Sequence, residues 1–357
     1  MDAVPHTPCY LRALSLTAGL VFALAALGCG EHETDPWRLG PVDAGRGAKD
    51  GTSEADAPIP DEPTPLGGLS RCEGAAPILG TTVEAVVRGV AAFNKEERAL
   101  VTLADRIRAV QLENDCPGEP IASFGIRGEV AQSAQIAVPL AGNRVLVADA
   151  QRTVVLDSAG AQAKVCELLA GGQVRARMLA ARADGSALAG FLRSPLVALT
   201  TSVADPDSCT AAELELTPEP HAIVALGVSA DGGFVTVERP TPGSQLVVAR
   251  YDRAGHRAGE SPPHLPAGHT GLICSAAGVV DAGGHGIVVA DSTCQRVLVF
   301  DAASLQATYI AEVDGSPRGV TLVADSADTA LVAIARAIRG GVEASFVTLP
   351  LPKLPLL

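Results

Sequence analysis

Residues 288–301, which read VVADSTCQRVLVFD, decide the fold. Two apolar runs, residues 288–290 and 297–300, each end in an aspartate and are separated by a short polar segment. Short runs rich in Val and bounded by turn residues predict two adjacent β-strands. The surrounding unit, which begins at His269, reads as strand, turn, strand, turn and strand. A single small sheet of this kind has two apolar faces that it cannot cover by itself.

The same arrangement recurs along the chain. Units begin at Arg88, Gln135, Arg175, His221, His269 and Arg318. Successive starts are 47, 40, 46, 48 and 49 residues apart, close to the period of a β-propeller blade. Blades must stack in a ring to bury both faces, and closure of the ring protects the strand edges. We therefore predict an all-β protein, a β-propeller with six blades. Seven blades are the alternative, because residues 81–87 are either an outer strand that closes the ring or the remnant of a seventh unit.

Two phrases resemble known propeller repeats. Residues 289–292 (VADS), followed by residues 296–301 (RVLVFD), resemble the NHL repeat. Residues 316–320 (SPRGV) and the turn at residues 324–328 are similar to the related YVTN repeat. The resemblance covers residues 88–349 and implies blades built of short strands. It carries no active-site residues over to this chain.

The beginning of the chain predicts export. Residues 13–27 are apolar or hydroxylic and carry no charge, follow Arg12, and are too short for a membrane-spanning helix of about 20 residues. This layout is typical of a signal peptide, here residues 1–28. The segment Ala26-Leu27-Gly28-Cys29 resembles the lipobox of bacterial lipoproteins, which implies lipidation of Cys29; an ordinary cleaved signal peptide is the alternative. Gly30 after the cysteine implies the outer membrane, facing the periplasm or the cell surface.

The mature chain is predicted to begin with a spacer. Residues 29–70 are rich in Pro and Gly, and residues 30–70 hold nine acidic and three basic side chains without an apolar period. Such a stretch cannot bury enough surface to offset its ordering entropy, so we predict a disordered, lipid-anchored linker. The propeller domain is then residues 71–357.

The cysteines agree with an oxidising compartment. Cys9 lies in the leader and Cys29 at the lipid site, which leaves six others: Cys72, Cys116, Cys166, Cys209, Cys274 and Cys294. An even number without metal-ligand spacing predicts disulfides rather than a zinc site. Fifteen pairings are open in principle. Order along the chain suggests 72 with 116, 166 with 209, and 274 with 294.

Composition limits the partners. The net charge of −13 argues against nucleic acid, which requires a basic face. We expect a monomer that meets the membrane through its lipid anchor and binds a protein or a small anionic ligand.

The first residues of the units are candidates for a binding site, because the innermost strand of each blade lines the central channel. Five of these six positions carry basic or potentially basic side chains, namely Arg88, Arg175, His221, His269 and Arg318. Gln135 is the sixth. Converging guanidinium and imidazole groups attract a carboxylate or phosphate. We therefore predict an anion site at one mouth of the channel; solvated turn residues are the plainer interpretation.

No catalytic motif is present. The sequence holds no G-x-S-x-G, H-E-x-x-H or P-loop, and the histidines of the loop at residues 255–269 match no metal-ligand spacing. We predict no catalytic residue, cofactor or metal, and favour a binding module over an enzyme. The alternative is an enzyme resembling the metal-dependent propeller lactonases or lyases, for which Glu84 and Glu129 are the nearest carboxylates to the channel.

Overall fold

A computed structural model describes part of the chain and divides it into two compact units, residues 1–51 and 52–357. The described residues all belong to the second unit. They are residues 61–73, 87–93, 97–103, 106–125, 135–149, 152–157, 162–168, 175–182, 184–191, 196–200, 208–261, 265, 268–323, 326–338 and 341–354. The predicted signal peptide and Cys29 lie outside them, as do Glu84 and Glu129.

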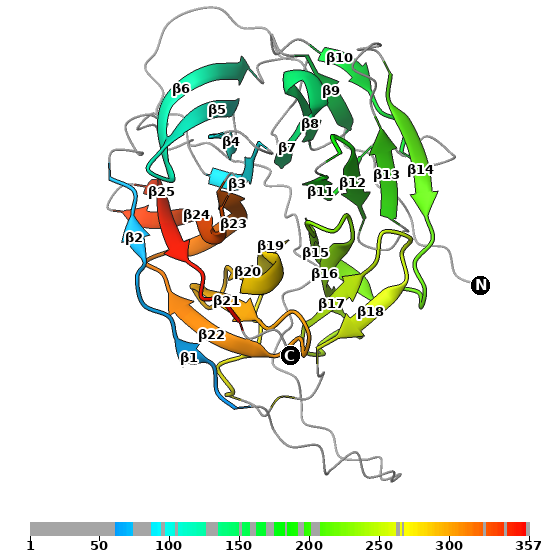
Figure 1. Cartoon of the computed structure of the whole chain (residues 1–357). Helices are drawn as coiled ribbons and strands as arrows, with labels where there is room; N and C mark the ends of the chain where they lie inside the picture. Colours follow the sequence, from blue (N-terminus) through cyan, green and yellow to red (C-terminus); the bar gives the residue numbers. More distant parts are fainter. Residues whose placement is uncertain are drawn as a thin grey trace, which may run out of the picture. The chain divides into compact units, whose positions relative to one another are not determined.

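The second unit is a six-bladed β-propeller, as the sequence predicts (Figure 1). Each blade is an antiparallel meander whose first strand lies innermost. Blade 1 consists of β3 (Val87–Ala92), β4 (Arg98–Leu103), β5 (Arg106–Glu113) and β6 (Cys116–Gly125). Blade 2 consists of β7 (Ile136–Leu140), β8 (Arg144–Ala148), β9 (Thr153–Leu156) and β10 (Gln162–Val165), with the 3-10 turn η1 (Ala141–Asn143). Blade 3 consists of β11 (Met178–Ala181), β12 (Ala187–Gly190), β13 (Leu196–Thr200) and β14 (Thr210–Leu214).

The remaining blades complete the ring. Blade 4 consists of β15 (Ala222–Val228), β16 (Phe234–Arg239), β17 (Val247–Tyr251) and β18 (Arg257–Glu260). Blade 5 consists of β19 (Ala276–Asp281), β20 (Ile287–Asp291), β21 (Arg296–Phe300) and β22 (Ala307–Glu312), with the 3-10 turn η2 (Gly283–His285). Blade 6 consists of β23 (Ser316–Val323), β24 (Ser326–Ile338) and β25 (Gly341–Pro350). Among the described residues no helix is long and apolar enough to span a membrane.

The core consists of six apolar clusters, one at each seam between neighbouring blades. Alternate residues of a strand serve opposite seams: Val288 and Ala290 of β20 belong to the cluster shared with blade 6, whereas Ile287 and Val289 belong to the one shared with blade 4. Both faces of a blade are therefore buried. This burial explains why the strands read as continuous apolar runs rather than as alternating ones.

The chain before blade 1 closes the ring. In β1 (Thr64–Pro65) it pairs in parallel with β22, and in β2 (Ser70–Arg71) it pairs antiparallel with β25, which gives blade 6 its fourth strand. Figure 1 shows both strands in blue along the rim beside β22 and β25. Leu66 and Leu69 pack against the apolar cluster between blades 5 and 6.

These strands correct two predictions. The disordered linker was expected to extend to residue 70, but residues 61–70 lie on the rim, because open edges of blades 5 and 6 accept their backbone hydrogen bonds. The fourth strand of blade 6 is β2, and Val87 begins the innermost strand β3; residues 81–86 lie outside the described residues. A closing strand of two residues is too short to show an apolar period in the sequence.

The three predicted disulfides are all confirmed. Cys72 pairs with Cys116, Cys166 with Cys209, and Cys274 with Cys294. The first joins the end of β2 on blade 6 to the start of β6 on blade 1, and the second joins the outer strands of blades 2 and 3. Two of the three therefore link neighbouring blades at the rim.

Candidate functional site

The inner strands share a backbone irregularity near their first residues. β-bulges occur in β3, β15, β19 and β23, and they place Arg88, Val224, Ala277 and Arg318 at the extra position. In three of these strands a glycine follows: Gly89, Gly278 and Gly319. The face of the propeller on which the inner strands begin is named the upper face here. A bulge redirects the side chain of the extra residue. The four bulges therefore decide which side chains lie at the upper mouth of the channel.

Arg318 and Arg88 lie on neighbouring inner strands at the same level. A Cβ atom on Gly319 would lie 3.1 Å from the Cα atom of Gly89, so the residues that precede these two glycines are adjacent across the seam. Both arginines are exposed. Arg88 also donates a hydrogen bond from Nη1 to Oε1 of Gln135 on blade 2, at 3.2 Å. The structure therefore brings Arg318, Arg88 and Gln135 together on blades 6, 1 and 2.

Arg175 and His221 precede the inner strands of blades 3 and 4. Arg175 lies three residues before β11, and His221 lies one residue before β15. The backbone N–H of His221 donates to Oε2 of Glu238, at 3.1 Å. Both side chains are half-buried, and in blade 4 the bulge position is held by Val224 rather than by His221.

Glu238 is a buried carboxylate at the end of β16, and its oxygens are fully engaged. It accepts from Thr236 Oγ1 (2.6 Å), Tyr251 Oη (2.7 Å) and Arg257 Nη2 (2.8 Å). Burial and the neighbouring Glu238 charge raise the pKa of Tyr251 far above its usual range, so it stays a donor. Burial alone would lower the pKa of Arg257, but the hydrogen bonds that Arg257 donates to Tyr251 Oη and the charge of Glu238 raise it overall. This network fixes the position of His221.

His269 lies away from the upper-mouth series. It is buried beside a small, mostly apolar pocket between blades 4 and 5, which has room for about one water molecule (20 Å³). The polar side chains of this pocket, besides His269, are Gln245, Ser261 and Gln306. Its Nδ1 accepts the N–H of Gly271 at 3.0 Å, and Nδ1 lies 3.8 Å from Glu62. His269 does not begin the inner strand of blade 5, because a loop separates it from β19. The bulge position in this strand is held by Ala277.

Neither of the described histidines of the loop at residues 255–269, His256 and His269, belongs to a group of side chains close enough to share an ion within the described part of the chain. His256 Nδ1 lies 3.1 Å from Asp252 Oδ2 on the turn between β17 and β18, His264 lies outside the described residues, and His269 is in the pocket above. Within the described part of the chain, the one group of His, Cys, Asp and Glu atoms close enough to share an ion is Cys274, Asp291 and Cys294.

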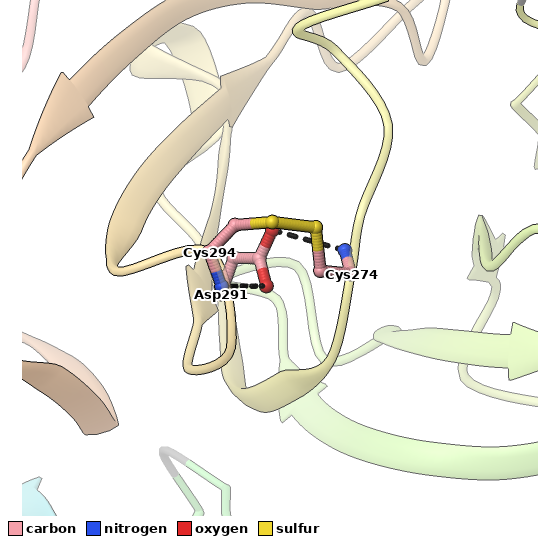
Figure 2. Close-up of side chains that lie close together, drawn as sticks. All are labelled: Cys274, Asp291 and Cys294. Atoms are coloured by element: carbon pink, nitrogen blue, oxygen red, sulfur yellow. Dashed lines mark hydrogen bonds between the residues drawn. A yellow bond between two sulfur atoms is a disulfide. The ribbon is translucent and has the colours of Figure 1, made fainter. Parts of the chain in front are cut away.

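That group is already engaged as a structural unit (Figure 2). The two sulfur atoms form a disulfide. The Asp291 carboxylate is fully buried and accepts the N–H groups of Cys274 (3.0 Å) and Ser275 (2.9 Å), and Arg296 Nε lies 3.2 Å away. A disulfide sulfur is not a thiolate ligand, and this carboxylate is satisfied by donors. The group therefore ties the segment before β19 to the end of β20, as Glu238 does for His221 in blade 4.

We expect Asp291→Asn to lower the free energy of unfolding by about 2–3 kcal/mol, because it removes the carboxylate partner of Arg296 and one of the two oxygens that accept the partly buried N–H groups of Cys274 and Ser275. Urea unfolding of the oxidised protein measures this loss. Asp301→Asn is the matched control: Asp301 accepts from Ala303 N (3.1 Å) and Ser304 N (2.7 Å) at a partly exposed turn, and its loss costs under about 1 kcal/mol. Equal losses in the two variants would contradict the buried role of Asp291.

Solved structures of similar shape confirm the fold class. A calcium-binding protein, regucalcin, from Agrobacterium tumefaciens matches with a TM-score of 0.51 and 14% identity over 83% of this chain and 99% of that chain. A streptogramin B lyase matches with a TM-score of 0.50 and 10% identity over 79% and 97%. Virginiamycin B lyase from Staphylococcus aureus matches with a TM-score of 0.49 and 12% identity over 78% and 87%. At 14% and 10% identity, the likeness to regucalcin and to streptogramin B lyase shows the β-propeller fold alone. No protein-family model and no curated protein sequence matches the chain.

Proposed function

We propose that this chain is an exported, lipid-anchored β-propeller that acts as a ligand- or protein-binding module at the cell envelope, with the upper mouth of its channel as an anion site. The observation that carries the proposal is that Arg318 and Arg88, on two neighbouring inner strands, lie together with Gln135, which directly precedes the third. Two exposed guanidinium groups and an amide are donors that suit a ligand with carboxylate or phosphate groups. The net charge of −13 makes such a basic cluster unusual on this chain.

The location is part of the same proposal. Lipidation of Cys29 and anchoring in the outer membrane, facing the periplasm or the cell surface, rest on the lipobox resemblance. The three disulfides support export, because such bonds persist in oxidising compartments. We also assign blades 5 and 6 to the NHL and YVTN type, which is supported by the coincidence of the RVLVFD phrase with β21. The proposal also includes that the protein is a monomer and binds no nucleic acid.

Citrate is a suitable probe of the upper mouth because it offers several carboxylates to Arg88, Arg318 and Gln135. We expect the double variant Arg88→Ala/Arg318→Ala to weaken citrate binding at least about 10-fold, measured by titration calorimetry at low salt. Adding Arg175→Ala tests the wider series and should abolish the remaining binding. Arg71→Ala is the control, since Arg71 lies on the rim of blade 6 beside Glu343. Unchanged affinity in the double and triple variants would remove the basis of this site.

A metal-dependent enzyme of lactonase or lyase type is the second candidate function. The propellers of similar shape include a protein described as calcium-binding and several lyases, which is the observation that favours it. A divalent metal at one equivalent per chain in the purified full-length protein, together with loss of that metal on Glu84→Gln or Glu129→Gln, would favour the enzyme over the binding module.

A further inference from the structure

The lower face of the propeller, opposite the upper mouth, carries a second set of charged groups at the seam between blades 3 and 4. Arg182 and Asp184 lie in the hairpin between β11 and β12, and Arg253 lies in the turn between β17 and β18. Along β11, Met178 and Ala180 belong to the cluster shared with blade 4, and Leu179 packs toward blade 2. By the same alternation, Arg182 lies on the side of Met178 and Ala180, which faces blade 4. The charges of Asp184 and Arg253 both act on it.

Arg182 presents two buried donors without an acceptor. Its Nε and Nη2 atoms are inaccessible to solvent, and within the described part of the chain neither makes a hydrogen bond. Nε–H and one Nη2–H point the same way and form the side-on edge of the guanidinium group. That edge is the one that binds both oxygens of a carboxylate or phosphate. Buried donors of a charged group are normally satisfied, and an unsatisfied pair calls for an explanation.

Asp184 does not satisfy that edge, because its oxygens serve other donors. Oδ1 accepts from Ser186 N (3.0 Å) and Ser186 Oγ (2.6 Å), and Oδ2 accepts from Arg253 Nη2 (3.0 Å). The hydrogen bond from Ser186 holds the pKa of Asp184 below its usual value, so it stays ionised and neutralises one of the two guanidinium charges. One positive charge is left over at this seam.

The surroundings hold Arg182 in place, and its two charged neighbours are exposed. Arg182 N donates to Ser186 O (2.8 Å) and Gly185 N donates to Arg182 O (3.0 Å), which closes the hairpin. Gly185 has a φ of +82°, and a Cβ there would lie 2.6 Å from Ala141 Cβ, so the hairpin rests on blade 2. The Arg253 side chain is 69% exposed and the Asp184 side chain is 45% exposed, so both charges beside Arg182 lie at the surface. Burial is the main cause that lowers the pKa of Arg182.

We propose that the side-on edge of Arg182, with Arg253 beside it, is a second binding site on the lower face, which takes one oxyanion of a small ligand, a carboxylate or a phosphate. Asp184 positions Arg253 and keeps the site from carrying two uncompensated positive charges. The oxygens of the ligand accept the hydrogen bonds of Arg182 Nε and Nη2, which have no acceptor among the residues that the structure describes. This site is independent of the upper mouth, which lies at the other end of the inner strands.

Inorganic phosphate and acetate are the probes, used on the full-length oxidised chain at constant ionic strength with chloride as the reference ion. We expect phosphate or acetate in the tens of millimolar range to raise Tm by about 3 °C, and Arg182→Met, made in the Arg88→Ala/Arg318→Ala background that removes the upper mouth, to abolish that rise. Titration calorimetry should show a loss of affinity of at least about 10-fold in the variant. No rise with either ion in the wild-type chain would overturn the proposal.

The ligand-free Tm of Arg182→Met separates a binding role from a structural one. Met fills a similar space without a charge, so it removes an unsatisfied buried group, and Tm without ligand should stay the same or rise. A fall of several degrees would show that Arg182 is a structural residue and would overturn the site.

The double variant Arg88→Ala/Arg318→Ala distinguishes binding at this site from binding at the upper mouth. It should retain the full phosphate response while losing citrate affinity at the upper mouth. If the phosphate response disappears in that variant and survives in Arg182→Met, the lower site is wrong and the upper mouth is the anion site. If citrate binding alone is insensitive to the double variant, the upper site is wrong and the lower one stands.

Discussion

Gly227→Ala is expected to destabilise the protein by about 4 kcal/mol. Gly227 lies in the innermost strand of blade 4, where a Cβ atom would lie 2.1 Å from the carbonyl oxygen of Val279 and 2.8 Å from its carbon. Both atoms belong to the backbone of β19, so no side-chain rotation relieves the clash. The two inner strands must separate, and the apolar cluster between blades 4 and 5 must open with them.

Two other glycines of the inner strands give a graded control. A Cβ on Gly319 would lie 3.0 Å from Val90 N, so Gly319→Ala should cost about 1–2 kcal/mol. A Cβ on Gly89 would meet nothing within 4 Å, so Gly89→Ala should change stability by less than about 0.5 kcal/mol. Urea unfolding of the three variants tests the order. Equal losses would show that flexibility of the glycines, rather than close approach of the strands, governs this region.

The sequence predicts the ring because each blade repeats its own apolar runs. The phrase at residues 288–301 forms β20 and β21 with the turn between them, as expected. The three cysteine pairings follow chain order because each pair lies either in one blade or in neighbouring ones. The repeated apolar runs and the order of the cysteines can both be read from one sequence, without knowledge of contacts between distant residues.

The rim strands could not be predicted in the same way. β1 and β2 are two residues long, and the segment that contains them is rich in Pro and Gly, so neither period nor composition distinguishes it from a spacer. Their positions depend on unpaired edges of blades 5 and 6, which exist only after the ring has formed. The apolar residues Leu66 and Leu69 were the one available signal.

The structure brings together three of the six predicted mouth residues, and anion binding there stays a prediction. Arg88 and Arg318 share the phrase Arg-Gly-Val, and Ala277-Gly278-Val279 is its counterpart in blade 5, which would have excluded His269 from the series. The position of Arg182 was not readable from the sequence. Whether a guanidinium group has an acceptor depends on the next blade, and residue type alone does not reveal that.

The disulfide between Cys72 and Cys116 holds the two ends of the ring together. The closing strand β2 pairs with β25 at Ser70 and Arg71, and Cys72 N donates to Phe346 O at 2.9 Å. So short a strand contributes few backbone hydrogen bonds, and isolated segments of this kind fray. The covalent bond to blade 1 keeps β2 against blade 6, and both sulfur atoms belong to the apolar cluster at that seam.

We therefore expect Cys72→Ala/Cys116→Ala to lower the free energy of unfolding by about 4 kcal/mol, since the bond spans 44 residues of sequence. Hydrogen exchange should show early loss of protection in the outer amides of β25, before the other blades open. The control, Cys274→Ala/Cys294→Ala, removes a bond that spans 20 residues within blade 5 and costs a similar amount, about 3 kcal/mol. It should leave β25 protected. Full protection of β25 in the first variant would show that the backbone pairing of β2 closes the ring without help from the disulfide.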